Sequence, residues 1–220
     1  MLIELDFWPV LAQWPLLLRG AGWTLVLTAI AALLGMTLGI ACAWSRVNGP
    51  RVLRWGAGAY VELIRNTPFI VQLFFIFFGL PAAGIKLSPF TASVLAMVVN
   101  LGAYAAEIIR AGIEATPRGQ FEAAQSLALS RMQTFLHVVL PPALKKVWPA
   151  LVSQITIVML GSAVCGQIST EELSYAANLI QSRNFRAFEA YILGTLMYLV
   201  LAIAVRRLLN WAGPRFVFGR

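Results

Sequence analysis

The sequence RGQFEAAQSLALSRMQTFLHVVLP, residues 118–141, is a polar, basic segment about the length of one helical hairpin. Long apolar runs flank it, and a helix needs about 20 mostly apolar residues to cross a bilayer. A hydrophobic chain that keeps so many polar residues together is expected to use them in water, against a partner. We call residues 118–141 the polar segment.

The amino-acid composition indicates a protein that is partly embedded in lipid. Hydrophobic residues make up 60% of the sequence and charged residues 12%, against roughly 25% charged residues in soluble domains. So little polar surface cannot cover a globule, so part of the surface must face lipid. The net charge of +8 does not indicate nucleic-acid binding, because the basic residues lie at the ends of apolar runs.

The sequence holds little material for metal or nucleophilic chemistry. His137 is the only histidine, and Cys42 and Cys165 lie inside apolar segments, as small buried hydrophobic residues do. The sequence contains no CxxC, HExxH or G-x-x-x-x-G-K-[ST] motif. We therefore expect a non-catalytic chain that binds neither a metal nor a cofactor of its own.

The apolar runs predict an all-α polytopic membrane protein with five transmembrane helices in one domain, residues 1–220. The fold is expected to break within the second span, because Pro68 lacks a backbone donor and disfavours helix at Thr67. The expected spans cover about residues 20–45, 60–85, 87–109, 147–170 and 187–208, with a polar loop at 110–146.

Lysine and arginine predict the orientation, because short cytoplasmic loops are enriched in them. Twelve lie on one side of the expected spans and four on the other, leaving out Arg65, which falls within a span. The richer side contains the polar segment and the C-terminus, so both are expected in the cytoplasm and the N-terminus outside. The twelve are Arg46, Arg51, Arg54, Arg110, Arg118, Arg131, Lys145, Lys146, Arg206, Arg207, Arg215 and Arg220, and the four are Arg19, Lys86, Arg183 and Arg186.

Within the polar segment, residues 120–130 are expected to form a short helix whose small side chains let a partner approach closely. Glu122 falls in its first turn, where the helix dipole favours an anion. An apolar patch follows from Phe135 to Leu140, and Pro141-Pro142 stops the run. The spacing alone leaves a second interpretation open, a loop helix that packs only on its own chain.

Three separated blocks carry a resemblance to a known family. Glu122-Ala123-Ala124, with Leu127-Ala128 and Leu140-Pro141 after it, is similar to the EAA motif of membrane subunits of binding-protein-dependent ABC importers. Three blocks of this chain resemble one branch of that family, the polar amino acid branch of the histidine/glutamine/arginine type. The blocks are VELIRNTPFIVQLFFIFFGLP (61–81), NLGAYAAEIIRAGIEATPRGQFEAA (100–124) and FRAFEAYILGTLMYLVL (185–201). The resemblance covers residues 18–212.

The resemblance implies a multi-pass permease subunit of a bacterial cytoplasmic (inner) membrane, which forms the pathway for polar amino acids or related small solutes. It also implies a second permease subunit, two cytoplasmic ATPase subunits that bind ATP and Mg²⁺, and an extracytoplasmic solute-binding protein. In that family the EAA helix is the coupling helix, which sits in a groove of the ATPase. Carried over, the residues expected to contact the ATPase are Arg118, Glu122, Ala123, Ala124, Ala128 and Arg131.

The sequence departs from the family pattern twice. The family usually has glycine where this chain has Ala128, and alanine in a left-handed turn costs about 1–2 kcal/mol. Either the turn is not left-handed here, or the following Leu129-Ser130 adapts. Family members also often read Lys-Asp-Thr-Ser-Leu where residues 160–164 read LGSAV. A different solute, or a subunit that does not contact the solute, would explain this second departure.

Polar residues inside the expected spans are the candidates for the solute pathway, because such groups are costly in lipid and mark function. A structural alternative stands beside several of them: Glu62, Arg65 and Glu107 could pair with one another, and Asn100 could join helices. The candidates are Glu62, Arg65, Asn66, Thr67, Gln72, Asn100, Tyr104, Glu107 and Ser162.

Three other functions are weighed against an importer permease for polar amino acids. The same architecture could import an opine or a modified amino acid. A self-sufficient carrier is disfavoured by five spans without a repeat, and a membrane enzyme by the missing catalytic constellation. The sequence leaves open the solute, whether the partner permease is identical, whether this subunit contacts the solute and how far the spans move.

Overall fold

The computed structural model describes residues 5–217, with the backbone alone at 216 and 217, and this part of the chain is helical without strands. The predicted all-α class is confirmed. Arg220, which entered the orientation count, lies outside the described residues. The α-helices are α1 (Trp8–Leu11), α2 (Trp14–Asn48), α3 (Arg51–Arg65), α4 (Phe69–Phe74), α5 (Pro89–Glu114), α6 (Arg118–Ser126), α7 (Arg131–Gln133), α8 (Leu140–Gly161), α9 (Leu173–Asn184) and α10 (Ala187–Ala212).

In the described part of the chain, five short helical stretches have a different winding from the α-helix. The wider π-helical stretches are η1 (Phe75–Gly79), η3 (Thr134–Val139) and η5 (Gly213–Val217). The tighter 3₁₀ stretches are η2 (Leu80–Ala83) and η4 (Ser162–Ile168). Four of them directly follow an α-helix and η2 follows η1, so they extend the helical runs rather than interrupt them.

Within residues 5–217, four helical stretches are long and apolar enough to cross a membrane: Trp14–Asn48, Pro89–Glu114, Arg131–Ile168 and Ala187–Arg215. A fifth is obtained if Arg51–Arg65 and Phe69–Ala83 count together as one broken span. The break lies at residues 66–68 and includes Pro68, whose missing backbone donor ends the helix. Helix boundaries differ from those expected: α3 begins nine residues before residue 60, and α5 runs on through residue 109 to Glu114.

The chain folds as two compact units, and the boundaries between them fall within the four long helices α2, α5, α8 and α10 and at the break before α4. Unit 1 comprises Met1–Ala31, Phe69–Met97 and Thr156–Val205, and unit 2 comprises Ala32–Pro68, Val98–Ile155 and Arg206–Arg220. Each unit is described by itself below. The polar segment and most of the candidate pathway residues belong to unit 2.

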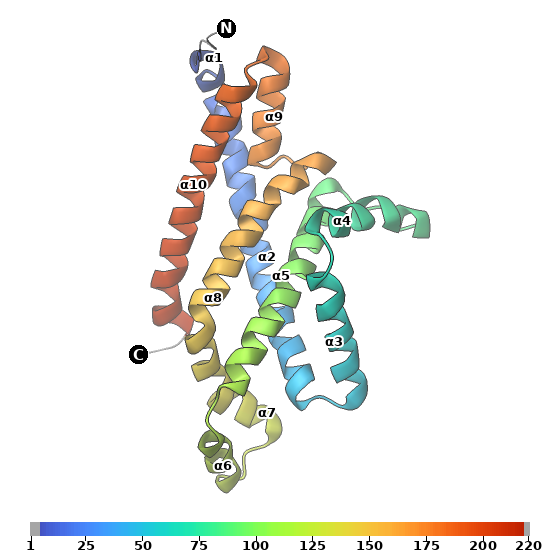
Figure 1. The fold of residues 1–220 in the computed structure, drawn as a ribbon, viewed down its shortest axis with the longest axis vertical. Coiled ribbons are helices and arrows are strands. Elements are labelled where there is room, and N and C mark those ends of the chain that lie inside the picture. Colours follow the sequence, from blue (N-terminus) through green and yellow to red (C-terminus); the bar gives the residue numbers. More distant parts are fainter. Residues whose placement is uncertain (1–4, 218–220) are drawn as a thin grey trace. The chain divides into compact units, whose positions relative to one another are not determined.

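Unit 2 packs the C-terminal part of α2 and α3 around the C-terminal part of α5, with close helix approach at small residues. A Cβ on Gly39 would lie 2.7 Å from that of Ala105, so glycine there lets α2 and α5 touch. A buried apolar cluster includes Ile109, Phe135 and Leu151 and joins α5 to the polar segment and α8. Figure 1 shows α6 and α7 together beyond the C-terminal end of α5.

Unit 1 is organised around the N-terminus of α9. Glu172, fully buried, caps this helix by accepting from the amides of Ser174 at 2.9 Å and Tyr175 at 2.7 Å, and it also accepts from the hydroxyl of Tyr198 on α10. The Thr24 hydroxyl on α2 accepts from the amide of Leu173 at 3.2 Å. These bonds fix α9 against two long helices.

Candidate functional site

The helix expected at residues 120–130 is α6, which starts after Pro117. Pro117 has φ −59° and ψ 140°, so the chain enters the helix from an extended conformation. Glu122 is exposed in the middle of α6, and the Ser126 hydroxyl donates to its carbonyl at 3.0 Å. The helix is short, so packing against the rest of unit 2 stabilises it more than its own helix propensity does.

The end of α6 is a Schellman motif with alanine in the position that favours glycine. Ala128 has φ +53°, the amide of Ala128 donates to Gln125 O at 2.9 Å, and the amide of Leu129 donates to Ala124 O at 3.1 Å. The turn is therefore left-handed, which removes the first of the two alternatives for Ala128. Alanine is held there at a cost of about 1–2 kcal/mol.

A capping box starts the next helix two residues later. The Ser130 hydroxyl accepts from Gln133 N at 3.3 Å, and Gln133 Oε1 accepts from Ser130 N at 2.9 Å. Ser130 is extended, with φ −65° and ψ 160°. Two adjacent terminal motifs thus fix the corner between α6 and α7, which gives the polar segment a defined shape.

The expected partner-facing residues of the polar segment do not all face outward. Arg118, Glu122, Ala123, Ala128 and Arg131 are exposed. Ala124 is buried, with 2% of its surface accessible, because it lies one turn after Phe121 on the face that packs inward. The side chain of Ala124 therefore packs within its own chain, beneath the surface expected to contact a partner.

Sequence reasoning missed three exposed apolar side chains beside these residues. Leu127 is 73% exposed, and Met132 and Leu136 are each 45% exposed. Together with Ala123 and Ala128 they give the polar segment an apolar surface with charged neighbours, which is the anatomy of a protein interface. Their spacing on either side of the left-handed corner breaks helical periodicity, so no single helix pattern could have found them.

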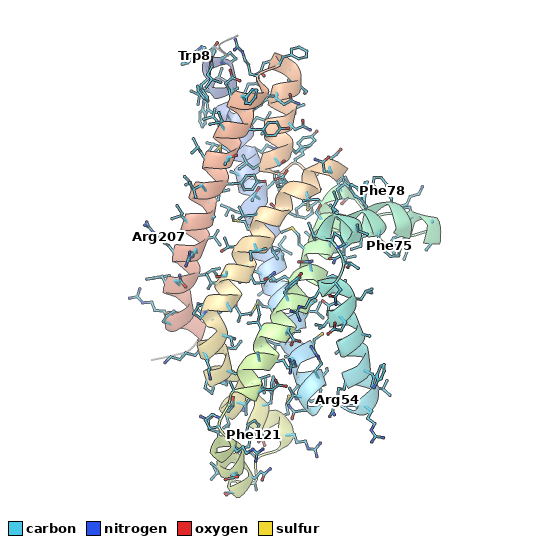
Figure 2. All side chains as sticks on the ribbon, viewed as in Figure 1. Trp8, Arg54, Phe75, Phe78, Phe121 and Arg207 are labelled. Atoms are coloured by element: carbon cyan, nitrogen blue, oxygen red, sulfur yellow. The ribbon has the colours of Figure 1, made fainter. Side chains whose placement is uncertain are left out.

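The opposite face of the polar segment packs on α5 and encloses a small cavity of about 190 Å³. Phe121, labelled in Figure 2, lies on this face, and buried Phe135 and Val139 lie on η3. The cavity is lined by Asn48, Ile113, Phe121, Gln125, Leu129, Arg131, Thr134, Phe135 and Val139. The apolar part of this lining links α6 to the long helices of unit 2.

Two of the three charged pathway candidates of unit 2, Arg65 and Glu107, belong to an ion-pair cluster centred on Glu107, and Glu62 does not. The Glu107 carboxylate lies 2.5 Å from Arg46 on α2, 2.5 Å from Arg110 on α5 and 3.9 Å from Arg65 on α3. The guanidinium of Arg65 also stands over the Tyr104 ring, 5.6 Å from its centroid. Arg65 and Glu107 therefore pair, as the structural alternative expected, and the cluster joins three helices.

Sequence reasoning counted Arg46 and Arg110 only as topology markers. The signal for Arg110 was its spacing three residues after Glu107 on one helix, where the two side chains meet. Arg110 also pairs with Glu114 one turn further on. Arg46 gave no comparable signal, because 61 residues separate it from Glu107.

The remaining candidates near the broken helix satisfy one another locally. Asn66 donates to the carbonyl of Glu62 at 2.8 Å and to its carboxylate at 3.0 Å, at the C-terminal end of α3. The Thr67 hydroxyl donates to Leu63 O at 2.8 Å. These bonds satisfy groups that the break before Pro68 leaves without helical partners.

Three candidates are buried. Asn100 on α5, in unit 2, is 8% exposed. Gln72 on α4 is 8% exposed, and Ser162 at the start of η4 is fully buried with its hydroxyl donating to Met159 O at 2.7 Å; both belong to unit 1. Within the described residues no group of three or more His, Cys, Asp or Glu side chains could hold a metal ion.

Comparison with known proteins places this arrangement among transport proteins. At the level of single proteins, the chain is 38% identical over 192 residues to the probable glutamine ABC transporter permease protein GlnM of Bacillus subtilis, covering 87% of this chain and 89% of that protein. It is 36% identical to the L-cystine transport system permease protein TcyB of Bacillus subtilis, covering 94% and 90%. It is 34% identical to the glutamine transport system permease protein GlnP of Escherichia coli K12, covering 92% of each.

Solved structures agree. A crystal structure of an amino acid ABC transporter with histidines contains a chain that matches at a TM-score of 0.85 and 36% identity, over 95% of this chain and 98% of that one. A chain of the inward-facing MetNI methionine ABC transporter shares the fold, with a TM-score of 0.69 and 21% identity over 89% and 95%. Residues 35–218 match the family model described as the binding-protein-dependent transport system inner membrane component. The chain belongs to this family of membrane-spanning transport components.

Proposed function

We propose that this chain is the permease subunit of an ABC importer and forms the pathway for polar amino acids or related small solutes. The observation that carries the proposal is the agreement of relatives named for glutamine and cystine transport over about nine-tenths of the chain. The α6–α7 corner supports it, since the chain presents a compact, exposed element joined by packing to its long helices.

The proposed partners are a second permease subunit, two ATPase subunits that bind ATP and Mg²⁺, and an extracytoplasmic solute-binding protein. Arg118, Glu122, Ala123, Ala128 and Arg131 would meet the ATPase, joined by Leu127, Met132 and Leu136. Ala124 would support this surface from beneath. Hydrolysis would belong to the ATPase, because the sequence contains no phosphate-binding G-x-x-x-x-G-K-[ST] loop.

The proposed location is the bacterial inner membrane, with the polar segment and the C-terminus in the cytoplasm. The distribution of lysine and arginine supports this orientation. ATP binding would close the two ATPase subunits, draw the polar segments of two permeases together and open the pathway outward. ATP must bind the closed state more tightly for such a shift, by several kcal/mol.

The proposed pathway residues divide by their contacts. Glu107 and Arg65 are engaged in the ion-pair cluster, so their proposed part is to hold α2, α3 and α5 together. Gln72, Asn100, Tyr104 and Ser162 stay candidates for the pathway, beside Glu62, Asn66 and Thr67 at the broken helix. The uncharged stretch at residues 160–164 is consistent with two alternatives: a solute different from that of relatives with a charged pair there, or a subunit that does not contact the solute.

Reconstitution in liposomes tests this function. The chain, assembled with its partner permease and ATPase, should show ATP hydrolysis that rises when the solute-loaded binding protein is added, and it should accumulate glutamine or cystine. Solute uptake by the chain alone, without ATP, would contradict the proposal and favour a self-sufficient carrier.

A further inference from the structure

A groove in unit 2 lies apart from the polar segment, where the C-terminal end of α2 meets the first turns of α3. Its volume is about 670 Å³, which is room for a lipid headgroup with its glycerol. The lining residues are Arg46, Val47, Arg54, Trp55, Gly58, Ala59, Glu62, Arg110 and Glu114.

The arginines of this groove differ in how far their charge is compensated. Arg46 and Arg110 are held by the ion-pair cluster on Glu107. Arg54 has its Nη2 3.5 Å from the carbonyl of Gly49, and among residues 5–217 no carboxylate lies within 4 Å of its guanidinium. Arg51, exposed one turn earlier on the same helix face, likewise forms no ion pair with a described residue.

Apolar side chains stand beside these two arginines. Trp55 is 79% exposed and Val52 is 81% exposed. Figure 2 shows Arg54 at the end of α3 that follows the turn from α2. Exposed tryptophan and arginine together at the end of a membrane helix are typical of headgroup depth, where the indole and the arginine stem meet both lipid and water.

The acidic residues of the groove lie away from Arg51 and Arg54. Glu62 follows Arg54 by eight residues, roughly 12 Å along the helix axis, and its carboxylate accepts from Asn66 at 3.0 Å. Glu114 pairs with Arg110. The groove thus has one end where Arg54 is without a carboxylate partner among the described residues, with Arg51 nearby on the same helix face, and one end where charges are paired.

We propose that Arg54 and Trp55 at this end of the groove, together with the neighbouring Arg51 just outside its lining, bind the phosphodiester headgroup of an anionic phospholipid, on the membrane side that carries the polar segment. Guanidinium groups donate paired hydrogen bonds that match phosphate oxygens. The indole and Val52 contact the glycerol and acyl carbons, which distinguishes a lipid from a free anion. The inference rests on the membrane placement of the family and not on the identity of the solute.

Native mass spectrometry of the full chain in detergent, titrated with dioctanoyl phosphatidylglycerol, tests the proposal. The double substitution R51Q/R54Q should weaken binding roughly 30-fold, as two arginines near a headgroup contribute. R206Q/R207Q is the matched control, because Arg206 and Arg207 are both exposed on α10 and their substitution removes the same amount of charge. This control should change the affinity less than twofold. Arg54→Lys keeps the charge but not the paired donors, so it should weaken binding by less than R51Q/R54Q does.

Each other outcome overturns the proposal. Equal losses in the two double variants would show attraction by net charge alone. Equal binding of phosphatidylcholine, or unchanged binding in R51Q/R54Q, would show that the arginines do not select an anionic headgroup. If inorganic phosphate displaced the lipid at equal concentration, and Trp55→Ser did not change lipid binding, the groove would be a site for free anions. The assay needs no ATPase, so failure of ATP-driven transport would leave its result intact.

Discussion

The amide of Leu129 donates to the carbonyl of Ala124 at 3.1 Å and closes α6 around Ala128, which has a left-handed backbone. This corner sets the exposed surface of the polar segment, because the chain reverses there before the capping box at Ser130. A residue type that resists the required conformation occupies its centre. The corner therefore stores strain that a single substitution can release.

Ala128→Gly should stabilise the chain by about 0.5–1 kcal/mol, since glycine adopts a positive φ freely but adds freedom to the unfolded chain. Thermal unfolding in detergent measures the change. Ala123→Gly, in the right-handed interior of the same helix, is the control and should destabilise by about 1 kcal/mol. Capture of the ATPase by Ala128→Gly should be retained; its loss would contradict the assigned corner.

Glu107→Gln should destabilise unit 2 by about 2–4 kcal/mol, because it removes the negative charge that three arginines share in a partly buried site. The Glu107 side chain is 23% exposed. Glu114→Gln is the control, since that side chain is 58% exposed and, among the residues that the structure describes, pairs with Arg110 alone, so a change under about 1 kcal/mol is expected. Equal effects of the two substitutions would show that the cluster does not act as a unit.

Gly213→Ala should destabilise the end of α10 by about 1–3 kcal/mol, because a new methyl would overpack the site. A Cβ there would lie 2.3 Å from Nε1 of Trp148, whose indole donates to Leu209 O at 3.2 Å. Gly22→Ala, in the interior of α2, is the matched control, because a Cβ at Gly22 meets nothing within 4 Å. This substitution should stabilise the chain by about 1 kcal/mol, since alanine favours helix more than glycine does. If Gly213→Ala left the free energy of unfolding unchanged, the Trp148 indole could not lie against Gly213 as the structure has it.

Glu172 should make stability depend on pH. Burial raises the pKa of its carboxyl above the usual 4.5, and hydrogen bonds from Tyr198, Ser174 and Tyr175 lower it by less. Because the folded chain then binds the proton more tightly, this contribution to stability is complete below the unfolded pKa and is lost as pH rises through the folded value.

Glu172→Gln carries no such proton and serves as the reference. The free energy of unfolding of the unsubstituted chain, minus that of Glu172→Gln, should fall as pH rises from about 4. Thermal unfolding across this range measures the difference. A difference that grows with pH would mean that the hydrogen bonds outweigh burial and keep the carboxylate ionised.

The periodicity of apolar residues was enough to predict an all-α membrane chain, because bilayer thickness dictates the length of each run. Pro68 was enough to place the break before α4, since a missing donor acts locally. The Arg46–Glu107 pair was beyond prediction, because residues 61 positions apart meet only through the packing of α2 on α5. The burial of Ala124 could have been predicted, because it lies three residues after Phe121 and so on the same helix face. The signal was weak, since alanine is found on buried and on exposed faces of helices alike.

Crosslinking from position 127 tests the central claim most directly, that the polar segment meets an ATPase in the cytoplasm. In a chain whose Cys42 and Cys165 are replaced by serine, Leu127→Cys should crosslink to the ATPase subunit of the assembled transporter, because that side chain is 73% exposed. Ala124→Cys, at a position that is 2% exposed, should crosslink far less. Labelling of Leu127→Cys from outside the cell, or no crosslink to the ATPase, would contradict the account.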